Sequence, residues 1–148
     1  MRLFEWLSRW GKALPKKNRL KILVLSAPLD DRFVLEDLGK ERGWELSFAS
    51  SPQEGFCLVS EHHFELILCE SDQPGYPWRE VMDRLSASSP RSCILLVSSV
   101  TGEYLWADIL QHGGYGVLPR PLRKQSALRT LDTAARFISP LASVPLGD

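Results

Sequence analysis

Short apolar runs alternate along the chain with longer stretches whose apolar residues recur at helical spacing. Each short run is bounded by turn residues, a pattern typical of strands buried on both faces of a parallel sheet. Five strands are predicted, at Lys21–Ser26, Glu45–Ala49, Leu66–Glu70, Ser92–Ser98 and Gly116–Pro119. The remaining stretches predict five helices, at Asp30 to about Gly43, Ser51 to about His62, Trp78 to about Ala87, Glu103–Gln111, and Arg123 to about Ile138. This alternation indicates one doubly wound α/β domain with a five-stranded parallel, flavodoxin-like sheet.

Two local patterns refine the helix predictions. Ser51 and Glu54 have capping-box spacing, with proline at the first helical position, which favours a helix start there. In the helix before it, Phe33, Val34 and Leu38 are expected to face the core.

The two ends of the chain differ from this body. Residues 1–20 carry a net charge of +5, and because the whole chain has a formal net charge of zero, the rest carries −5. Residues 2–14 predict a short basic amphipathic helix, followed by a linker from Pro15, with one apolar face made of Leu3, Trp6, Leu7, Trp10 and Leu14. The predicted units are therefore the N-terminal helix and linker (1–20), the α/β domain (21–138) and a flexible tail (139–148).

Three roles are open for the N-terminal helix. Trp6 and Trp10, with a basic opposite face, suit a groove on a protein partner or the seam of a homodimer. The same apolar face suits packing onto its own domain, and it also suits weak contact with an anionic membrane surface. No apolar run approaches the ~20 residues that span a bilayer, and no secretory signal is evident.

Several other classes of function are disfavoured. Cys57, Cys69 and Cys93 have no metal-binding or redox spacing, and two of them lie in predicted strands, so reduced thiols and a cytoplasmic location are expected. Glu61-His62-His63 lacks a converging third ligand, so no metal is expected. The acidic body argues against nucleic-acid binding. No nucleophile–histidine spacing or phosphate-binding glycine loop points to an enzyme or a cofactor.

The ends of the predicted strands carry the candidate chemistry. In open α/β sheets, ligands collect at the carboxyl ends of the strands. Ser26 and Ala27 follow the first strand, and Glu70 ends the third. Ser98 ends the fourth strand, and Arg120 follows the fifth. These side chains are therefore expected to meet on one rim of the sheet.

Segments around these strand ends resemble the receiver domains of bacterial two-component response regulators, namely residues 21–25, 64–75, 94–99 and 113–121. The resemblance covers roughly residues 21–138. It implies a signalling domain in which an aspartate at the end of the third strand accepts a phosphoryl group. It also implies a Mg²⁺ ion held by two acidic residues after the first strand, a hydroxyl after the fourth strand, and a lysine before the proline after the fifth.

The chain departs from that pattern at most of these positions. Glu70 takes the place of the accepting aspartate, and Arg120 that of the lysine. Ser26 and Ala27 replace the acidic pair, while Ser98 keeps the hydroxyl. Phosphoryl transfer needs a divalent cation, and Mg²⁺ is gripped by carboxylates. With Glu70 almost the only charged ligand left, and longer than aspartate, the rim is expected not to accept phosphate.

The predicted function is that of a stand-alone degenerate receiver, or pseudo-receiver, which binds a protein without being phosphorylated. An ion pair between Glu70 and Arg120, with a two-point grip of the guanidinium and Ser98 donating to it, is predicted to hold one switch state. The alternative is a solvated Glu70 with no mechanical role. Two further functions are open: a phosphorelay receiver whose acceptor is an unconventional residue such as Asp72, and a membrane-peripheral scaffold.

Candidate partner-binding residues lie on the last two predicted helices. In receiver domains this face meets partners, so the resemblance assigns the role to Tyr104, Trp106, Arg123 and Lys124, in addition to Trp6 and Trp10 of the N-terminal helix. One of Leu105 and Trp106 must face the core, which leaves the other free. A signalling or regulatory protein, or a second copy of the chain, is the expected partner.

Overall fold

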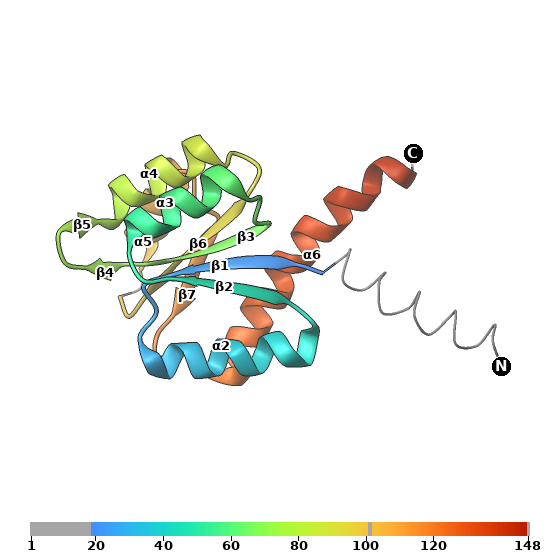
Figure 1. Ribbon diagram of the computed structural model, residues 1–148, viewed down its shortest axis with the longest axis horizontal. Coiled ribbons are helices and arrows are strands. Elements are labelled where there is room, and N and C mark those ends of the chain that lie inside the picture. The colour runs from blue at the N-terminus through green and yellow to red at the C-terminus, as the bar shows by residue number, and fades with distance from the viewer. Residues whose placement is uncertain (1–18, 101, 148) are drawn as a thin grey trace.

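A computed structural model describes residues 19–100 and 102–147, with side chains described as far as Ile138 (Figure 1). The elements in chain order are β1 (Lys21–Leu25), α2 (Leu29–Arg42), β2 (Glu45–Ala49), α3 (Pro52–Glu61), β3 (Leu66–Glu70), β4 (Asp72–Gln73), β5 (Tyr76–Pro77), α4 (Trp78–Ser88), β6 (Cys93–Ser98), α5 (Glu103–Gln111), β7 (Gly116–Pro119) and α6 (Lys124–Gly147). The predicted N-terminal helix, with Trp6 and Trp10, lies outside the described residues.

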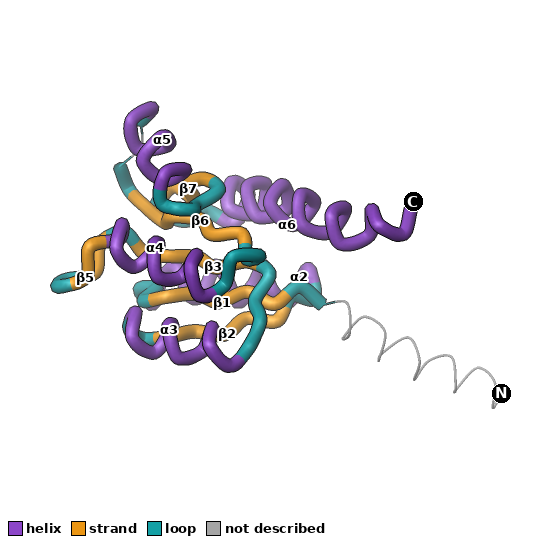
Figure 2. The backbone as a smooth tube through the Cα atoms, turned by 90° about the horizontal axis from the view of Figure 1, so that it is seen from above, coloured by secondary structure: helices purple, strands orange, loops and turns teal. Residues whose placement is uncertain are grey.

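Five strands form one parallel sheet in the order β2-β1-β3-β6-β7. Helices α2 and α6 cover one face of this sheet, and α3, α4 and α5 cover the other (Figures 1 and 2). The predicted doubly wound fold is therefore confirmed. The five predicted strands are all present, with ends that differ from the prediction by at most one residue.

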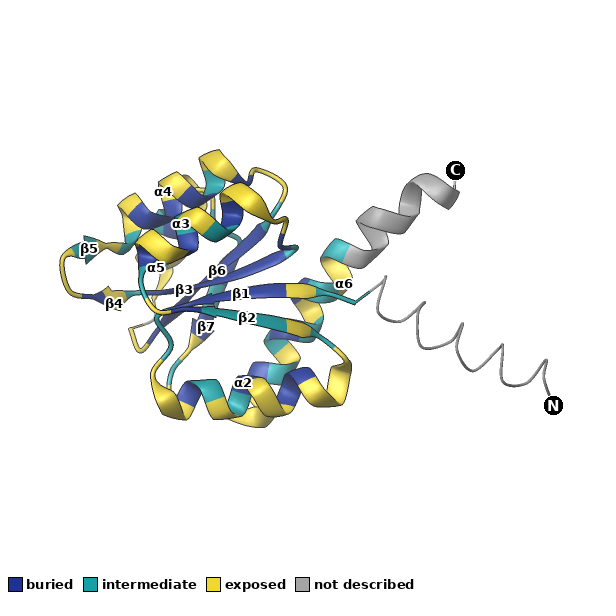
Figure 3. Cartoon of the chain, in the orientation of Figure 1, coloured by how far each residue is buried: buried dark blue, intermediate teal, exposed yellow. Residues whose placement is uncertain are grey.

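Successive residues of the central strands enter two different cores, because side chains alternate between the faces of a strand. In β1, Ile22 and Val24 pack with the helices α2 and α6, whereas Leu23 and Leu25 pack with α3, α4 and α5. All five residues of β3 are buried, as Figure 3 shows for the middle of the sheet. A continuous apolar run is what such a doubly covered strand requires.

Helix α3 begins as its sequence predicts. The Ser51 hydroxyl accepts a hydrogen bond from the backbone N–H of Glu54 at 3.2 Å. The Glu54 carboxylate reaches back one residue further than predicted, to the backbone N–H of Ser50 at 2.8 Å. The first contact satisfies a backbone donor that the helix itself leaves free, and the second ties the residue before the cap to the first turn.

Helix α2 turns Leu38 inward as predicted, and Val34 packs, partly buried, against the same core, but Phe33 points away from it. The buried residues of α2 are Asp31, Leu35, Leu38 and Gly39, which follow helical spacing, while Phe33 is 58% exposed. The expectation that Phe33 faces the core is therefore wrong. The inward face carries Leu35 and Asp31 instead, and the carboxylate of Asp31 contacts the guanidinium described below.

Two further features differ from the sequence prediction. Strands β4 and β5 pair antiparallel as a small hairpin after β3, where a Pro-Gly turn alone is predicted. Helix α6 runs to Gly147, well past the predicted end near Ile138. The backbone of residues 139–147 is thus helical, although two prolines in it each remove one amide from the hydrogen-bond ladder.

The three cysteines differ in how far they are buried. Cys69 and Cys93 are buried, and Cys57 is exposed. Burial raises the pKa of the Cys69 thiol to about 12 and that of Cys93 to about 11, so both behave as small core hydrophobes.

Within the described part of the chain, no helix combines the length and the apolar character needed to cross a bilayer.

Candidate functional site

The carboxyl-terminal rim of the sheet brings together the side chains that follow β1, β3 and β7. Glu70 is the last residue of β3, in the middle of the sheet, and its exposed fraction is only 3%. Arg120 follows β7 and is placed by a backbone hydrogen bond from its N–H to the carbonyl of Ser98 at 2.9 Å. The side chain of Arg120 can then reach across the end of β6 to β3.

Arg120 links two carboxylates on this rim. Its Nη1 donates to Oε2 of Glu70 at 2.8 Å, so the predicted ion pair is present. Its Nε and Nη2 both donate to Oδ2 of Asp31, at 3.0 and 2.7 Å. The two-point grip therefore falls on Asp31 and not on Glu70. The side chains of Arg120, Asp31 and Glu70 are 18%, 9% and 3% exposed, which makes the network largely buried.

Asp31 is the site residue that the sequence reasoning missed. The prediction counted Glu70 as almost the only carboxylate on the rim, and that count is wrong. Asp31 lies in the first turn of α2, too far along the chain to count as the end of β1. The available signal was the Asp30-Asp31 pair at the start of a predicted helix. The spacing of Asp31 with Leu35 and Leu38 places it on the inward face of that helix.

The β4–β5 hairpin is tied onto the same rim through Gln73. The side-chain amide of Gln73 donates from Nε2 to the backbone carbonyl of Glu70 at 2.8 Å. Its carbonyl oxygen accepts a hydrogen bond from the Ser26 hydroxyl at 2.5 Å. The backbone N–H of Asp72 donates to Oε2 of Glu70 at 3.1 Å. One buried amide therefore joins the ends of β1 and β3 and fixes the hairpin that follows.

Ser26 is held in an unusual backbone conformation at this junction. Its φ angle is 59°, a region that L-residues other than glycine seldom occupy. The backbone N–H of Ser26 donates to the carbonyl of Ala49 in β2, and its hydroxyl contacts Gln73. Ala27 is half-buried and packs against the core formed with α2 and α6. Neither residue presents a charge to the rim.

Ser98 does not join the network as predicted. Its hydroxyl donates to the backbone carbonyl of Val100 and accepts from the backbone N–H of the same residue, both at 3.0 Å. Ser98 is 3% exposed, so these local bonds satisfy a buried hydroxyl and shape the loop after β6. The expectation that it donates to Glu70 is wrong.

The electrostatics of the rim are set by burial and by the balance of charges. Burial raises the pKa of the Glu70 carboxyl. The Asp72 backbone N–H and the Arg120 guanidinium act against this shift, while the negative charges of Asp72 and Asp31 add to it. Two carboxylates thus share one guanidinium, which is the only basic side chain found within bonding distance of either in the described residues.

The donor set at the rim does not fit a divalent cation. Mg²⁺ needs carboxylate oxygens arranged around a single centre. Here, Oε2 of Glu70 and Oδ2 of Asp31 converge on the guanidinium of Arg120. Across the described ranges, no group of three or more His, Cys, Asp or Glu side chains is arranged to hold a metal. In the Glu61-His62-His63 run, Nε2 of His62 lies 4.0 Å from Oε1 of Glu61, and both side chains are exposed.

The predicted partner-binding residues are split between two surfaces. On α5, Tyr104 is 93% and Trp106 52% exposed, whereas Leu105 packs into the core, so the choice between Leu105 and Trp106 is settled. A hollow of about 580 Å³ lies beside this helix, between Trp106, Leu110 and Val117. Lys124, on α6, forms an ion pair with Glu41 of α2. Arg123 is exposed at the start of that helix.

Solved structures with the same fold include a chemotaxis protein and response regulators. The chain is 18% identical to the chemotaxis protein CheY4 of Vibrio cholerae, with a TM-score of 0.71 over 78% of this chain and 98% of that one. A two-component response regulator from Clostridium difficile is 16% identical, with a TM-score of 0.73 over 82% and 99%. A response regulator from Thermotoga maritima is 14% identical, with a TM-score of 0.72 over 80% and 98%.

These likenesses confirm the predicted CheY-like receiver fold. No family model matches the sequence, and no curated protein matches it. At these identities, the fold is what the solved structures have in common with the chain. The role of the rim must therefore be argued from its own residues.

Proposed function

We propose that this chain is a degenerate receiver domain that works in signalling by binding a protein partner and does not depend on phosphorylation. The observation that carries the proposal is the buried Asp31–Arg120–Glu70 network. In this network the two rim carboxylates already share a cationic partner that is supplied by a side chain of the chain itself. A guanidinium is planar and permanently charged, and it suits carboxylate partners better than an ammonium group does.

The same network argues against Glu70 as an acceptor of phosphate. Oε2 of Glu70 already accepts from Arg120 and from the backbone of Asp72, so only Oε1 is left to attack a phosphodonor. Burial favours the neutral form of this carboxyl, which is the weaker nucleophile. The side chain of Gln73 lies between the ends of β1 and β3 and adds no negative charge.

Signalling through a partner is supported by the exposed apolar surface of α5. Tyr104 and Trp106 together offer two aromatic side chains, the residue types that most often dominate protein interfaces. The adjoining hollow beside Val117 and Leu110 could receive an apolar side chain of the partner. On this view, the charge network holds the loops of the rim in one arrangement and α5 carries the binding surface.

The test uses a small phosphodonor. The full chain is incubated with acetyl phosphate and Mg²⁺ and its intact mass is measured, alongside a receiver domain that carries the usual aspartate. We expect an adduct on the comparison protein and none on this chain. A stable phosphoryl adduct would refute the proposal. Repeating the measurement with Glu70→Gln and Asp72→Asn would then assign the acceptor, and loss of the adduct in Asp72→Asn alone would establish a working receiver with an unconventional acceptor.

A further inference from the structure

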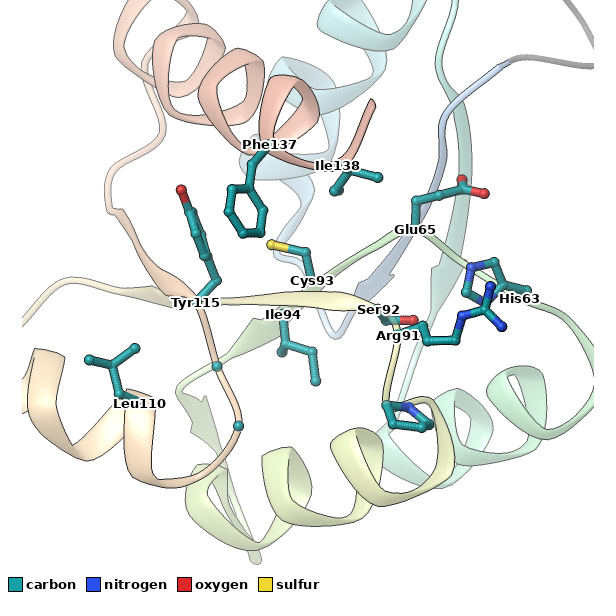
Figure 4. Close-up of a pocket in the computed structure, with 13 residues that line it drawn as sticks. His63, Glu65, Arg91, Ser92, Cys93, Ile94, Leu110, Tyr115, Phe137 and Ile138 are labelled. Carbon is teal, nitrogen blue, oxygen red and sulfur yellow. The ribbon is translucent and has the colours of Figure 1, made fainter. Parts of the chain in front are cut away.

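A hollow of about 650 Å³ lies on the opposite rim, where the strands β3, β6 and β7 begin (Figure 4). Its apolar wall is formed by Leu110, Tyr115, Phe137 and Ile138. Phe137 is 50% exposed, and its ring centroid lies 5.0 Å from that of Tyr115. Figure 4 shows these side chains around one space, with the sulfur of Cys93 turned toward Phe137. We call this space the amino-terminal hollow.

The polar groups at the base of this hollow already have partners. The backbone carbonyl of Glu65 accepts from the N–H of Cys93 at 2.9 Å, and that of Ile94 accepts from the N–H of Tyr115 at 2.7 Å. The Ser92 hydroxyl donates to the carbonyl of Phe64. Among the described residues, no buried side-chain nitrogen or oxygen is left without a hydrogen bond. What the hollow lacks is therefore apolar contact, which an apolar side chain would supply.

The first strand, β1, begins beside this hollow. The backbone N–H of Lys21 donates to Oε1 of Glu65 at 2.7 Å, and Glu65 is one of the residues that line the hollow. Eighteen residues precede the described part of the chain. Their apolar residues are spaced for one face of a helix, made of Leu3, Trp6, Leu7, Trp10 and Leu14. Arg19 and Leu20 are already placed, with the Leu20 carbonyl accepting from the N–H of Glu45, so the tether is the four residues from Pro15 to Asn18, which could span about 13 Å when extended.

We propose that residues 3–14 dock in the amino-terminal hollow of their own chain, with Trp6 and Trp10 as the anchors. Two tryptophans carry the largest apolar surface of that segment, and the hollow offers them two half-open aromatic rings. The +5 charge of residues 1–20 is attracted to the −5 charge of the remaining chain. Glu65 provides a carboxylate at the edge of the hollow nearest to Lys21, while Arg91 and His63 line the same end.

Docking in the same chain is favoured over docking in a second copy by the short linker. A segment tethered by so few residues has an effective concentration on the order of millimolar near its attachment point, well above that of a free second copy in solution. A second hollow competes with this site, because it is lined by Arg19 itself together with Lys40, Gly43 and Trp44. That hollow carries Glu36 as well as Lys40, so charge does not separate the two sites. Its Phe48 ring is already covered by the guanidinium of Arg32, 4.1 Å from the ring centroid, whereas Phe137 is 50% exposed, so we assign the segment to the amino-terminal hollow.

The experiment places a nitroxide spin label on the segment and reads its position from the amide signals of the body. Cys57→Ser removes the exposed thiol, and Ser8→Cys adds a labelling site that leaves the five residues of the predicted apolar face in place. We expect the amides of Glu65, Arg91 and Tyr115 to lose most of their intensity in the oxidised form and to regain it when the label is reduced.

The matched control carries the same label together with Trp6→Ala and Trp10→Ala. In this variant we expect the intensity loss at the hollow to disappear, and the midpoint of thermal unfolding to fall below that of the labelled parent. Strongest broadening at Lys40 and Trp44, or broadening spread evenly over the body, would overturn the proposal. Broadening in a mixture of labelled chain and isotope-labelled but spin-free chain would also overturn it, since it would place the segment on a second copy.

Discussion

Replacing Arg120 with methionine should cost this protein much more stability than the same change in an exposed ion pair. The substitution keeps most of the apolar length of the side chain and removes the guanidinium. Glu70 and Asp31 would then be left without the cation that both now contact, at exposed fractions of 3% and 9%. The three hydrogen bonds from Arg120 to these carboxylates would also be lost.

The magnitude follows from burial. Removing one partner from a buried ion pair costs ~3–5 kcal/mol, because the remaining charge is left uncompensated. Arg120 keeps 18% of its side chain exposed, so water offsets part of the loss, and we expect the low end of that range. A loss of about 3 kcal/mol corresponds to a shift of about 1.5 M in the urea midpoint, for an m-value of about 2 kcal/mol/M.

The assay is urea unfolding at pH 7, followed by circular dichroism. The control is Arg42→Met, the same change in the exposed pair that Arg42 forms with Asp132, where the side chains are 44% and 26% exposed. That pair should contribute less than about 1 kcal/mol. Equal midpoint shifts for the two variants would refute the argument that the Arg120 network is a buried one. A smaller Arg120→Met deficit at pH 5 than at pH 7 should accompany the expected result, since the unpaired carboxylates can then take up protons.

Three further substitutions test other parts of the structure. Glu70→Gln should remove a pH dependence of stability. Burial raises the folded-state pKa of Glu70 above its ordinary value of 4.5, so the proton that Glu70 holds in the folded state contributes fully to the free energy of unfolding below that pH. This contribution is lost as the pH rises through the raised pKa. Urea titrations from pH 4 upward should show the wild type losing stability relative to the variant, and parallel curves would contradict this. Gly55→Ala should destabilise by ~1–3 kcal/mol, because the new Cβ would lie 2.9 Å from carbons of Leu25, and a midpoint unchanged from wild type would show that α3 can shift freely. Ser51→Ala should cost about 1 kcal/mol by removing the cap of α3, with Ser60→Ala at the end of the same helix as the control.

The strand ends could be predicted from the sequence because they depend on short-range signals. Each strand is an apolar run with a sharp end, so the residues that follow it fall on one rim by geometry alone. That reasoning placed Glu70 and Arg120 together, and the two are in contact at 2.8 Å. It also identified the helix start at Ser51, since a cap is specified by residues that lie within one turn.

What escaped prediction depends on contacts between distant segments. Asp31 and Arg120 are 89 residues apart in sequence, and only the assembled fold shows that Asp31 faces inward to pair with Arg120 while Phe33 stays exposed. The β4–β5 hairpin has two-residue strands, too short for any periodicity to be read. The role of Gln73 depends on Ser26, 47 residues earlier, and no local pattern relates the two. Ser98 is expected from the sequence to donate to Glu70, but its hydroxyl donates to the backbone carbonyl of Val100, two residues further along the same loop.

The ion pairs of Arg120 with Glu70 and Asp31 bear on how long a signalling state of this domain would last. An acyl phosphate hydrolyses, so a phosphorylated receiver returns to its unphosphorylated state with time. The ion pairs of a guanidinium with two carboxylates are not consumed by such a reaction. A pseudo-receiver held in one state by these ion pairs, as proposed above, would have no phosphorylated state whose lifetime could be regulated. Its influence in the cell would then rise and fall with the number of copies made and degraded, and with whatever else competes for the same partner.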